Sequence, residues 1–510
     1  SDYNLICRNI QPEQVISLTI CDDNDTPGQS QLFFSHFRIE QFTRLHSLTL
    51  IRIELQSLRT IFSDLYKLKQ LRSLSFDIET VQYKYPNDTH TLLINNYTQV
   101  IPQLNHLHLN NRDVLMSGPL PYLHSLKLEK CSVNELETIF QQTPQLKSLC
   151  VCLNMNSLKF KFNIPNNQLI RLNLKIHGYR ISIEEIEQFL SQLHYLKHLE
   201  LITKGWQNLF DGYRWQRITN TFIMFNFKFD APNILMANTL ESFSTPFWLE
   251  IKHWFVGYKG NYLFSIPHFA PDHLDISSQP LCIHLTALNH TIIYDGLNKI
   301  TIREDDTIDK NHYFTHSKEL ELKCSISLKN LTSTIDLNQI KHLSILSLND
   351  LLGLIPLEST MPQLHELSIK DDVTSDMIEI MKHYQFKQIH KLEISVFSEY
   401  NDYVIEELSR IFLYTQYLIY KSPIQSKQTM VRFIDGFKHL SNASFYGDSK
   451  FFITEYSFLL NPNSLIKYSQ RLTKDNFTCR LYYLKTSHIT CSIHWWIDEQ
   501  VNHFLKIKLF

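Results

Sequence analysis

The sequence predicts an α/β repeat protein in which short parallel strands alternate with helices. Three observations predict this class. A hexad of the form Leu-x-x-Leu-x-Leu recurs along the chain, stretches of helical periodicity separate its copies, and residues that begin or end helices stand at the junctions. Because these local preferences agree with one another, their combination is stronger evidence than any one of them.

The hexads define the predicted strands. The fourth and sixth residues of each copy share one side of an extended strand, and the first residue enters from the preceding turn. In the first half the copies start 26, 33, 19, 23, 23 and 27 residues apart, and most of these steps match a leucine-rich repeat of about 20 to 29 residues. An earlier strand is predicted from VISLTI at 15–20. The copies are LHSLTL (45–50), LRSLSF (71–76), LNHLHL (104–109), LHSLKL (123–128), LKSLCV (146–151), LIRLNL (169–174) and LKHLEL (196–201), then LNKITI (297–302), KELEL (318–322), LSILSL (343–348), LHELSI (364–369) and IHKLEI (389–394).

Helices are predicted between the strands. Apolar residues recur at helical spacing in 55–65 and 183–193, and the second half contains helical segments near 373–384 and 401–418. Ser132 with Glu135, and Ser182 with Glu185, have the spacing of a capping box, which satisfies free N–H groups at a helix start. Prolines stand two residues before the first leucine of several strands and stop the preceding helix there: Pro102, Pro121, Pro144 and Pro362.

These patterns predict a leucine-rich-repeat solenoid of horseshoe shape, with concave parallel strands and outer helices. The aromatic middle segment contains a hairpin pattern around Lys259–Asn261, and it is either an insertion or an irregular pair of repeats. The tail contains strand-like segments at 477–484 and 488–497, which we expect to cover the open end of the core. The predicted organisation is an N-terminal strand and acidic loop (1–44), a first repeat block (45–202), the irregular aromatic segment (203–296), a second repeat block (297–440) and a C-terminal β cap (441–510).

Charge and hydropathy exclude several classes of partner. The formal net charge is −2 and the pI is near 6.9, so the chain as a whole does not attract nucleic acid or an anionic membrane surface. No apolar run reaches the roughly 18 residues that a membrane helix needs. We therefore expect no nucleic acid and no membrane among the partners.

The nine cysteines are scattered and odd in number, which favours reduced thiols in a cytoplasmic or nuclear protein. Seven Asn-x-Ser/Thr sequons favour the alternative, an extracellular leucine-rich-repeat recognition module without a ligase role. Because Asn, Ser and Thr are abundant in this chain, we expect most of the sequons to arise by chance.

The stretch DDNDTPGQ near the start, the PQL sequence that begins at 102, 144 and 362, and the segment TPFWLEIKHWFVGY resemble divergent F-box and leucine-rich-repeat proteins. This resemblance spans nearly the whole chain. It implies a substrate receptor of a cullin-type ubiquitin ligase, in which an F-box helix cluster binds the Skp adaptor and the repeats bind a target protein. Only residues 1–14 precede the first predicted strand, and they lack the F-box pattern. The ligase role and the Skp adaptor therefore require an F-box upstream of Ser1, and without one the resemblance implies target binding alone.

No catalytic, cofactor-binding or metal-binding motif is found, and we expect no enzymatic activity and no cofactor. Cys150 and Cys152 are the best metal or redox candidates because they share one strand face, but no second pair of ligands follows at zinc-site spacing. Two free thiols are the better interpretation. The histidines on neighbouring strands are interpreted in the same way, as polar surface residues.

The remaining candidate is the strand face itself. The third and fifth residues of each hexad, and the residue after the hexad, point away from the leucine core, so stacked strands align them on one concave surface. Both charge signs alternate there with small hydroxyl groups, which suits a protein partner better than a nucleic acid. The predicted protein-binding residues are Ser73, Ser75, His106, His108, Lys127, Glu129, Cys150, Arg171, Asn173, Lys175, His198 and Glu200.

Overall fold

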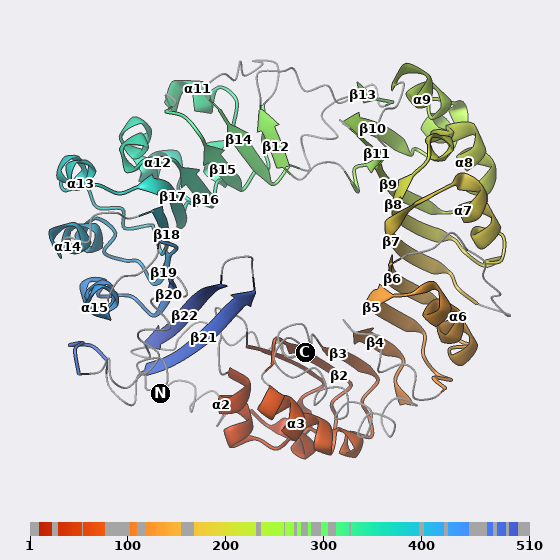
Figure 1. Cartoon of the computed structure of the whole chain (residues 1–510), viewed down its shortest axis with the longest axis horizontal. Coiled ribbons are helices and arrows are strands. Elements are labelled where there is room, and N and C mark those ends of the chain that lie inside the picture. The colour runs from red at the N-terminus through yellow and green to blue at the C-terminus, as the bar shows by residue number, and fades with distance from the viewer. Residues whose placement is uncertain are drawn as a thin grey trace. The chain divides into compact units, whose positions relative to one another are not determined.

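The computed structural model describes most of the repeat region. It divides into two compact units, each with its own sheet and its own hydrophobic core. Helices lie on one face of the sheet within each unit (Figure 1). The residues described are 10–22, 29–53, 55–76, 103–109, 119–154, 168–230, 236–259, 261–269, 273–276, 284–286, 297–303, 313–325, 328–396, 402–422, 427–447, 467–472, 477–485 and 489–497.

The N-terminal unit is built on a 12-stranded sheet with the order β1-β2-β3-β4-β5-β6-β7-β8-β9-β11-β10-β13. Strands β1 to β9 are parallel and pair in chain order. The strands are β1 (Ser17–Cys21), β2 (Ser47–Ile51), β3 (Ser73–Phe76), β4 (His106–Leu109), β5 (Ser125–Cys131), β6 (Ser148–Asn154), β7 (Arg171–Ile181), β8 (His198–Gly205), β9 (Met224–Asp230), β10 (Phe255–Lys259), β11 (Tyr262–Ile266) and β13 (His284–Leu285). The α-helices are α2 (Gln29–His36), α3 (Leu55–Asp64), α6 (Val133–Gln142), α7 (Ile183–Leu190), α8 (Gly212–Ile218) and α9 (Met236–Ser242), with a π-helix, η7, at Phe247–Ile251.

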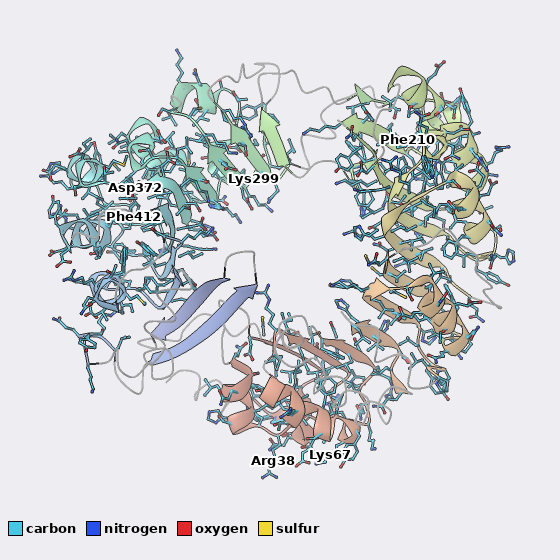
Figure 2. All side chains as sticks on the ribbon, viewed as in Figure 1. Arg38, Lys67, Phe210, Lys299, Asp372 and Phe412 are labelled. Carbon is cyan, nitrogen blue, oxygen red and sulfur yellow. The ribbon has the colours of Figure 1, made fainter. Side chains whose placement is uncertain are left out.

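The hexad leucines form the core of this unit. Leu107 pairs with Leu126, then Leu149, then Leu172 across β4 to β7. Each of these side chains is at most 3% exposed. Side chains fill the space between the sheet and the helices (Figure 2). The prediction that leucines of successive hexads are buried together is confirmed.

The predicted helix starts are also confirmed. Ser132 caps α6 and Ser182 caps α7, and in each case the glutamate three residues later bonds back to the serine N–H. The hydroxyl of Ser182 accepts the N–H of Glu185 at 3.3 Å, and the carboxylate of Glu185 accepts the N–H of Ser182 at 2.8 Å. Both capping boxes therefore use the residues that their spacing indicated.

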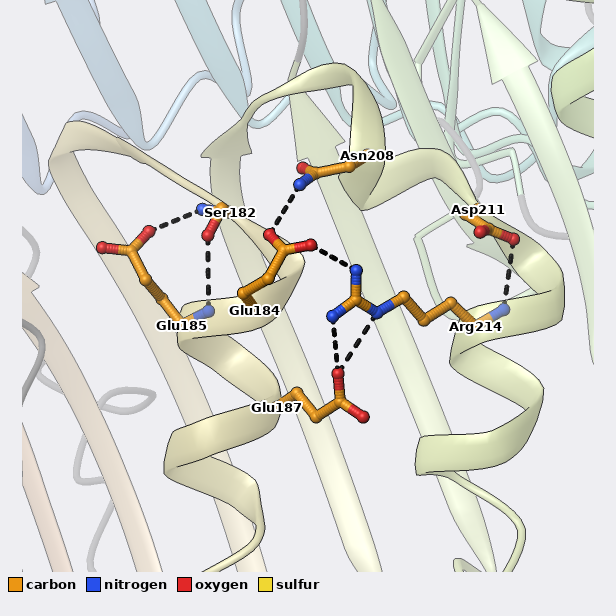
Figure 3. A network of polar contacts seen from close by, with 7 residues as sticks. All are labelled: Ser182, Glu184, Glu185, Glu187, Asn208, Asp211 and Arg214. Carbon is orange, nitrogen blue, oxygen red and sulfur yellow. Dashed lines mark hydrogen bonds and ion pairs between the residues drawn. The ribbon is translucent and has the colours of Figure 1, made fainter.

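An arginine links α7 to the next helix, α8 (Figure 3). Arg214 of α8 contacts Glu184, and its Nη2 atom lies 2.7 Å from the Oε2 atom of Glu187. Asn208 donates to Glu184 at 2.7 Å, and the carboxylate of Asp211 caps α8 by accepting the N–H of Arg214 at 3.1 Å. The two helices are thus held together by charged groups at their surface.

Strand β9 extends the parallel ladder into the aromatic segment, for which the sequence predicts either an insertion or irregular repeats. Its Phe225 pairs with Leu199 of β8, so an aromatic residue occupies a hexad leucine position. The ring of Trp215 lies 4.8 Å from that of Phe225 and 5.6 Å from that of Phe229. The predicted hairpin is confirmed as β10 and β11, and β11 pairs antiparallel with β9. The ladder of this unit therefore ends in antiparallel strands.

The C-terminal unit is built on a 10-stranded sheet with the order β12-β14-β15-β16-β17-β18-β19-β20-β22-β21. Its strands are parallel up to β20, and β22 and β21 follow antiparallel. The strands are β12 (His273–Ile276), β14 (Lys299–Ile302), β15 (Glu319–Leu322), β16 (His342–Ile345), β17 (Glu366–Asp372), β18 (Lys391–Val396), β19 (Tyr417–Tyr420), β20 (Asn442–Gly447), β21 (Phe477–Lys485) and β22 (Ile489–Ile497). The α-helices are α11 (Leu328–Thr332), α12 (Leu357–Thr360), α13 (Ser375–Met381), α14 (Asp402–Ile411) and α15 (Lys427–Gly436).

Three predictions for this unit were wrong in detail. The hexad placed at 343–348 is out of register, because Leu343 pairs with Leu320 and Leu367, so the unit starts at Ile340. The helical segment predicted over 401–418 ends at 411, and β19 begins at 417. The pattern does not end at 440, since β20 continues the parallel ladder with Ala443 and Phe445 at the buried positions.

Candidate functional site

The predicted binding residues lie in rows that cross the strands of the N-terminal unit. The fifth hexad residues are consecutive partners in the ladder, and so are the third hexad residues. We call this surface the N-terminal strand face. The fifth-position row contains Ser75, His108, Lys127, Cys150, Asn173 and Glu200, and the third-position row contains Ser73, His106, Ser125, Ser148, Arg171 and His198.

Two predicted residues, Glu129 and Lys175, follow the hexads. The ladder shifts register between β5 and β6 after Leu128, so Glu129 has no assigned partner on β6, whereas Lys175 lies opposite Cys152. Side chains of Lys127, Arg171 and Lys175 are exposed, as is that of His106. The structure therefore aligns ten of the twelve predicted residues in two rows and leaves Glu129 and Lys175 outside them.

Polar contacts on this face are few and local. Ser75 Oγ lies 3.0 Å from His108 Nδ1, and the side-chain amide of Asn173 donates to Glu200 at 2.6 Å. The second carboxylate oxygen of Glu200 lies 2.9 Å from Nε2 of His268, a residue just beyond β11. His268 follows no hexad, so the repeat pattern could not have identified it.

The two cysteines of β6 are free thiols. Burial raises the pKa of Cys150, with smaller contributions from the charges around it, and burial also raises the pKa of Cys152. Both thiols are consequently protonated at neutral pH and weakly nucleophilic. Among the residues that the structure describes, no group of three or more His, Cys, Asp or Glu side chains is arranged to bind a metal ion.

The basic residues of the N-terminal strand face differ in their partners. Lys204 of β8 forms an ion pair with Asp230 at 3.3 Å. Within the described part of the chain, no ion pair joins Lys127, Arg171 or Lys175 to a carboxylate. Lys175 and Lys204 both add to the positive potential at His177, whose pKa is lowered first by burial and then by these two charges. Lys127, Arg171 and Lys175 therefore have positive charges that no ion pair with a described residue neutralises.

The matching face of the C-terminal unit is internally neutralised. Glu393 accepts hydrogen bonds from Lys370 on β17 at 2.9 Å and from Lys421, just after β19, at 2.8 Å. Burial pushes the pKa of Glu393 upward, but the two lysines outweigh it and the pKa is lowered. Further pairs of the same kind are Lys299 with Glu321 at 2.7 Å and Lys391 with Glu366 at 3.1 Å.

A further row, which the hexad pattern did not predict as part of the surface, consists of the second residue of each hexad. These residues stand in the turn that enters each strand, and we call them the entry row. Lys147 and Ser148 both donate their N–H groups to the carbonyl of His124, and Lys197 and His198 repeat this with the carbonyl of Ile170. The entry row of the N-terminal unit is Ile16, His46, Arg72, Asn105, His124, Lys147, Ile170, Lys197 and Ile223.

Comparison with known proteins adds little to this geometry. No protein-family model and no curated protein sequence matches the chain. Among solved structures, it is similar to a leucine-rich-repeat protein of Leptospira interrogans, with 14% identity over 83% of this chain and 94% of that one, at a TM-score of 0.21. A likeness at this score supports no argument. The parallel strands and the helices on one face of each sheet are what establish the mixed α/β class. None of the helices in the described ranges has the length and apolar character to cross a bilayer.

Proposed function

We propose that this chain is a protein-interaction scaffold with a leucine-rich-repeat solenoid architecture, and that the N-terminal strand face binds the target protein. The observation that supports this proposal is the contrast between the two strand faces. Charges that are already paired within a sheet gain little from a partner, whereas unpaired charges are free to form complementary contacts across an interface. Lys127, Arg171 and Lys175 form no ion pair with a described residue, whereas Glu393 and its two lysines are already paired with one another.

The face also suits a polypeptide in its other groups. Serine hydroxyls lie beside the charges in the third-position row, and Glu200 places negative charge within the same surface. A mixed surface of this kind favours a protein partner over a uniformly charged polymer. No bound group or redox chemistry is needed for the proposed role.

The test is a binding experiment with the whole chain. Lys127→Glu/Lys175→Glu reverses two exposed charges on the strand face, and Arg217→Glu/Lys329→Glu makes the same change on two exposed helix surfaces. A partner identified by proximity labelling should lose at least about tenfold in affinity with the first variant and change by less than about twofold with the second. Equal effects of the two variants would refute the proposal.

A narrower proposal concerns the use of this binding. The resemblance to F-box proteins supports a role in which the bound target is presented to a ubiquitin ligase. Full-length product from the natural gene should then co-purify with a Skp adaptor, and the bound target should be ubiquitylated in a reconstituted reaction. Full-length product that does not bind the adaptor would remove the ligase role and leave target binding intact.

The alternative of an extracellular recognition module depends on the sequons. Asn330 on α11 is exposed and could accept a glycan, whereas Asn442 on β20 is 5% exposed and could not do so in the folded protein. Native protein whose mobility is changed by a glycosidase, with the added mass at Asn330, would favour this alternative.

A further inference from the structure

Eight of the nine entry turns of the N-terminal unit contain no acidic residue, and the first turn, 13–17, contains Glu13. Each entry turn comprises the five residues that end at the third position of a hexad. The eight turns without an acidic residue run from 43–47 to 220–224. Asp and Glu are absent from all eight turns, although they make up 51 of the 510 residues in the chain. The basic residues in these turns are Arg44, Lys69, Arg72, Lys147, Arg171 and Lys197, accompanied by His46, His106, His124, His194 and His198.

The structure places these turns side by side. Because the second residue of each hexad bonds to the second residue of the previous one, the entry row crosses the sheet in steps of one strand, about 4.8 Å. Within the described residues no ion pair joins Arg72, Lys147 or Lys197 to a carboxylate. Like charges therefore accumulate along one edge of the sheet.

The C-terminal unit shows that the architecture does not require the absence of acidic residues near the entry row. Its entry row contains Lys318 and Lys341, but the adjacent third positions contain Glu319 and Glu366. Glu366 pairs with Lys391 at 3.1 Å, and Asn298 donates to Glu319 at 3.3 Å. The same type of turn thus accommodates acidic residues in the C-terminal unit and has none in the eight turns from 43–47 to 220–224 of the N-terminal unit.

The helices that precede the turns do not account for the basic residues. A helix C-terminus attracts cations, but the effect falls off beyond the last turn. Lys147 follows the end of α6 at Gln142 by five residues, and Lys197 follows the end of α7 at Leu190 by seven. Both lysines lie outside the range in which a helix end would stabilise them.

The same edge exposes apolar side chains between the charges. Ile170 stands between Lys147 and Lys197 in the entry row, and Ile223 follows Lys197. Ile223 is 67% exposed, and Ile170 and Met224 are each 37% exposed. A partner on this edge would meet positive charge and apolar surface in alternation.

We infer that this edge binds an extended acidic segment of a protein in which carboxylates alternate with apolar side chains. The inference rests on the proposed function and specifies the chemistry of the partner. Lys147 and Lys197 are two strands apart, about 10 Å, which an extended chain covers in three residues at about 3.3 Å each. Glu129 and Glu200 lie on the adjoining strand face and disfavour a broader polyanion such as a nucleic acid duplex.

The experiment uses the whole chain and a fluorescein-labelled peptide of alternating glutamate, leucine and serine. The test variant is Lys147→Glu/Lys197→Glu. The matched control, Lys318→Glu/Lys341→Glu, changes the equivalent two positions in the C-terminal unit. We expect the test variant to weaken binding by about tenfold and the control by less than about twofold, with an affinity that falls as salt is added.

A neutral pair, Lys147→Gln/Lys197→Gln, should weaken binding by an intermediate factor, and all variants should keep the thermal midpoint of the parent. The inference is overturned if the peptide does not bind saturably or if both charge reversals weaken it equally. It is also overturned if single-stranded RNA or inorganic polyphosphate binds more tightly than the peptide with the same dependence on Lys147 and Lys197.

Failure of this inference can be told apart from failure of the proposed function. A partner that is lost with Lys127→Glu/Lys175→Glu but is insensitive to Lys147→Glu/Lys197→Glu would contradict the acidic segment alone. A partner that tolerates both sets of changes would contradict the proposed function as well.

Discussion

Glutamates at equivalent positions on the two strand faces have different neighbours. Glu393 contacts Lys370 on β17 and Lys421 just after β19, whereas Glu200 contacts an asparagine and a histidine. Both glutamates are the fifth residue of their hexads, so the difference in their contacts comes from the side chains that the neighbouring strands and loops place beside them. A charge on a repeat surface is therefore understood only together with the residues one strand away on either side.

His342 shows how burial on such a strand changes a titratable group. It is half-buried on β16, with Nε2 at 2.9 Å from the hydroxyl of Ser368. Burial is the main cause that lowers its pKa below the ordinary value of 6.5, against the opposing charges of Glu366 and Glu319 and with a smaller lowering contribution from Lys391. The imidazole is accordingly neutral at pH 7.

This gives a prediction for the pH dependence of stability. Because the folded pKa is lower than the unfolded pKa, the unfolded chain takes up the proton first as pH falls below about 6.5. The free energy of unfolding should therefore decrease from pH 7.5 to pH 5.5, and His342→Gln should reduce that decrease. Urea unfolding of both proteins at the two pH values measures the difference, and an identical decrease in both would contradict the prediction.

At the scale of elements, the hexads predicted the strands well wherever leucine filled the buried positions. Leu107, Leu126 and Leu149 are buried partners, as their spacing indicated. Strand β9 was missed because Phe225 takes the leucine position, and the hexad of β16 was displaced because Ile340 starts it. A pattern based on leucine cannot recognise a position whose only requirement is that an apolar side chain of suitable size be buried.

The candidate surface was predicted only in part, for a related reason. The third and fifth residues of a hexad could be placed on one face because strand side chains alternate. The entry row stands before the strand, in a turn, where alternation gives no direction. A comparison of the second residues of all hexads, such as Lys147 with Lys197, could have found it from the sequence.

Helix starts offer a prediction at this scale. Ser182→Ala removes the hydroxyl that accepts the N–H of Glu185 at the start of α7 and should cost about 1 kcal/mol. Ser191→Ala at the exposed end of the same helix is the control and should cost less than about 0.5 kcal/mol. Denaturant unfolding of the two variants tests this, and equal losses would show that the cap contributes no more than an ordinary surface contact.

On the scale of the whole chain, the main feature is the presence of two separate cores. The buried residues of the N-terminal unit form one cluster from Val15 to Leu263, and those of the C-terminal unit form another from Leu297 to Leu472. Each core has its own sheet and its own antiparallel strands at the end of the parallel ladder. We therefore expect each unit to respond by itself to a defect in its core.

Paired truncations test this expectation. Leu149→Ala and Leu367→Ala each remove a fully buried ladder leucine, one in each unit, and each should destabilise its own unit by about 2–5 kcal/mol. Hydrogen exchange followed by mass spectrometry should show faster exchange in peptides of the altered unit only. Faster exchange throughout the chain after either substitution would mean that the units unfold as one.

Strands β1 to β8 and β15 to β19 pair only with the strands next to them in the sequence, and this has an evolutionary consequence. Duplication of one strand–helix segment inside a ladder would lengthen the sheet by a single step of about 4.8 Å and leave every other strand with its previous kind of neighbour. A gene of this design can therefore lengthen or shorten either sheet by gaining or losing whole segments, without redesign of the rest of the molecule.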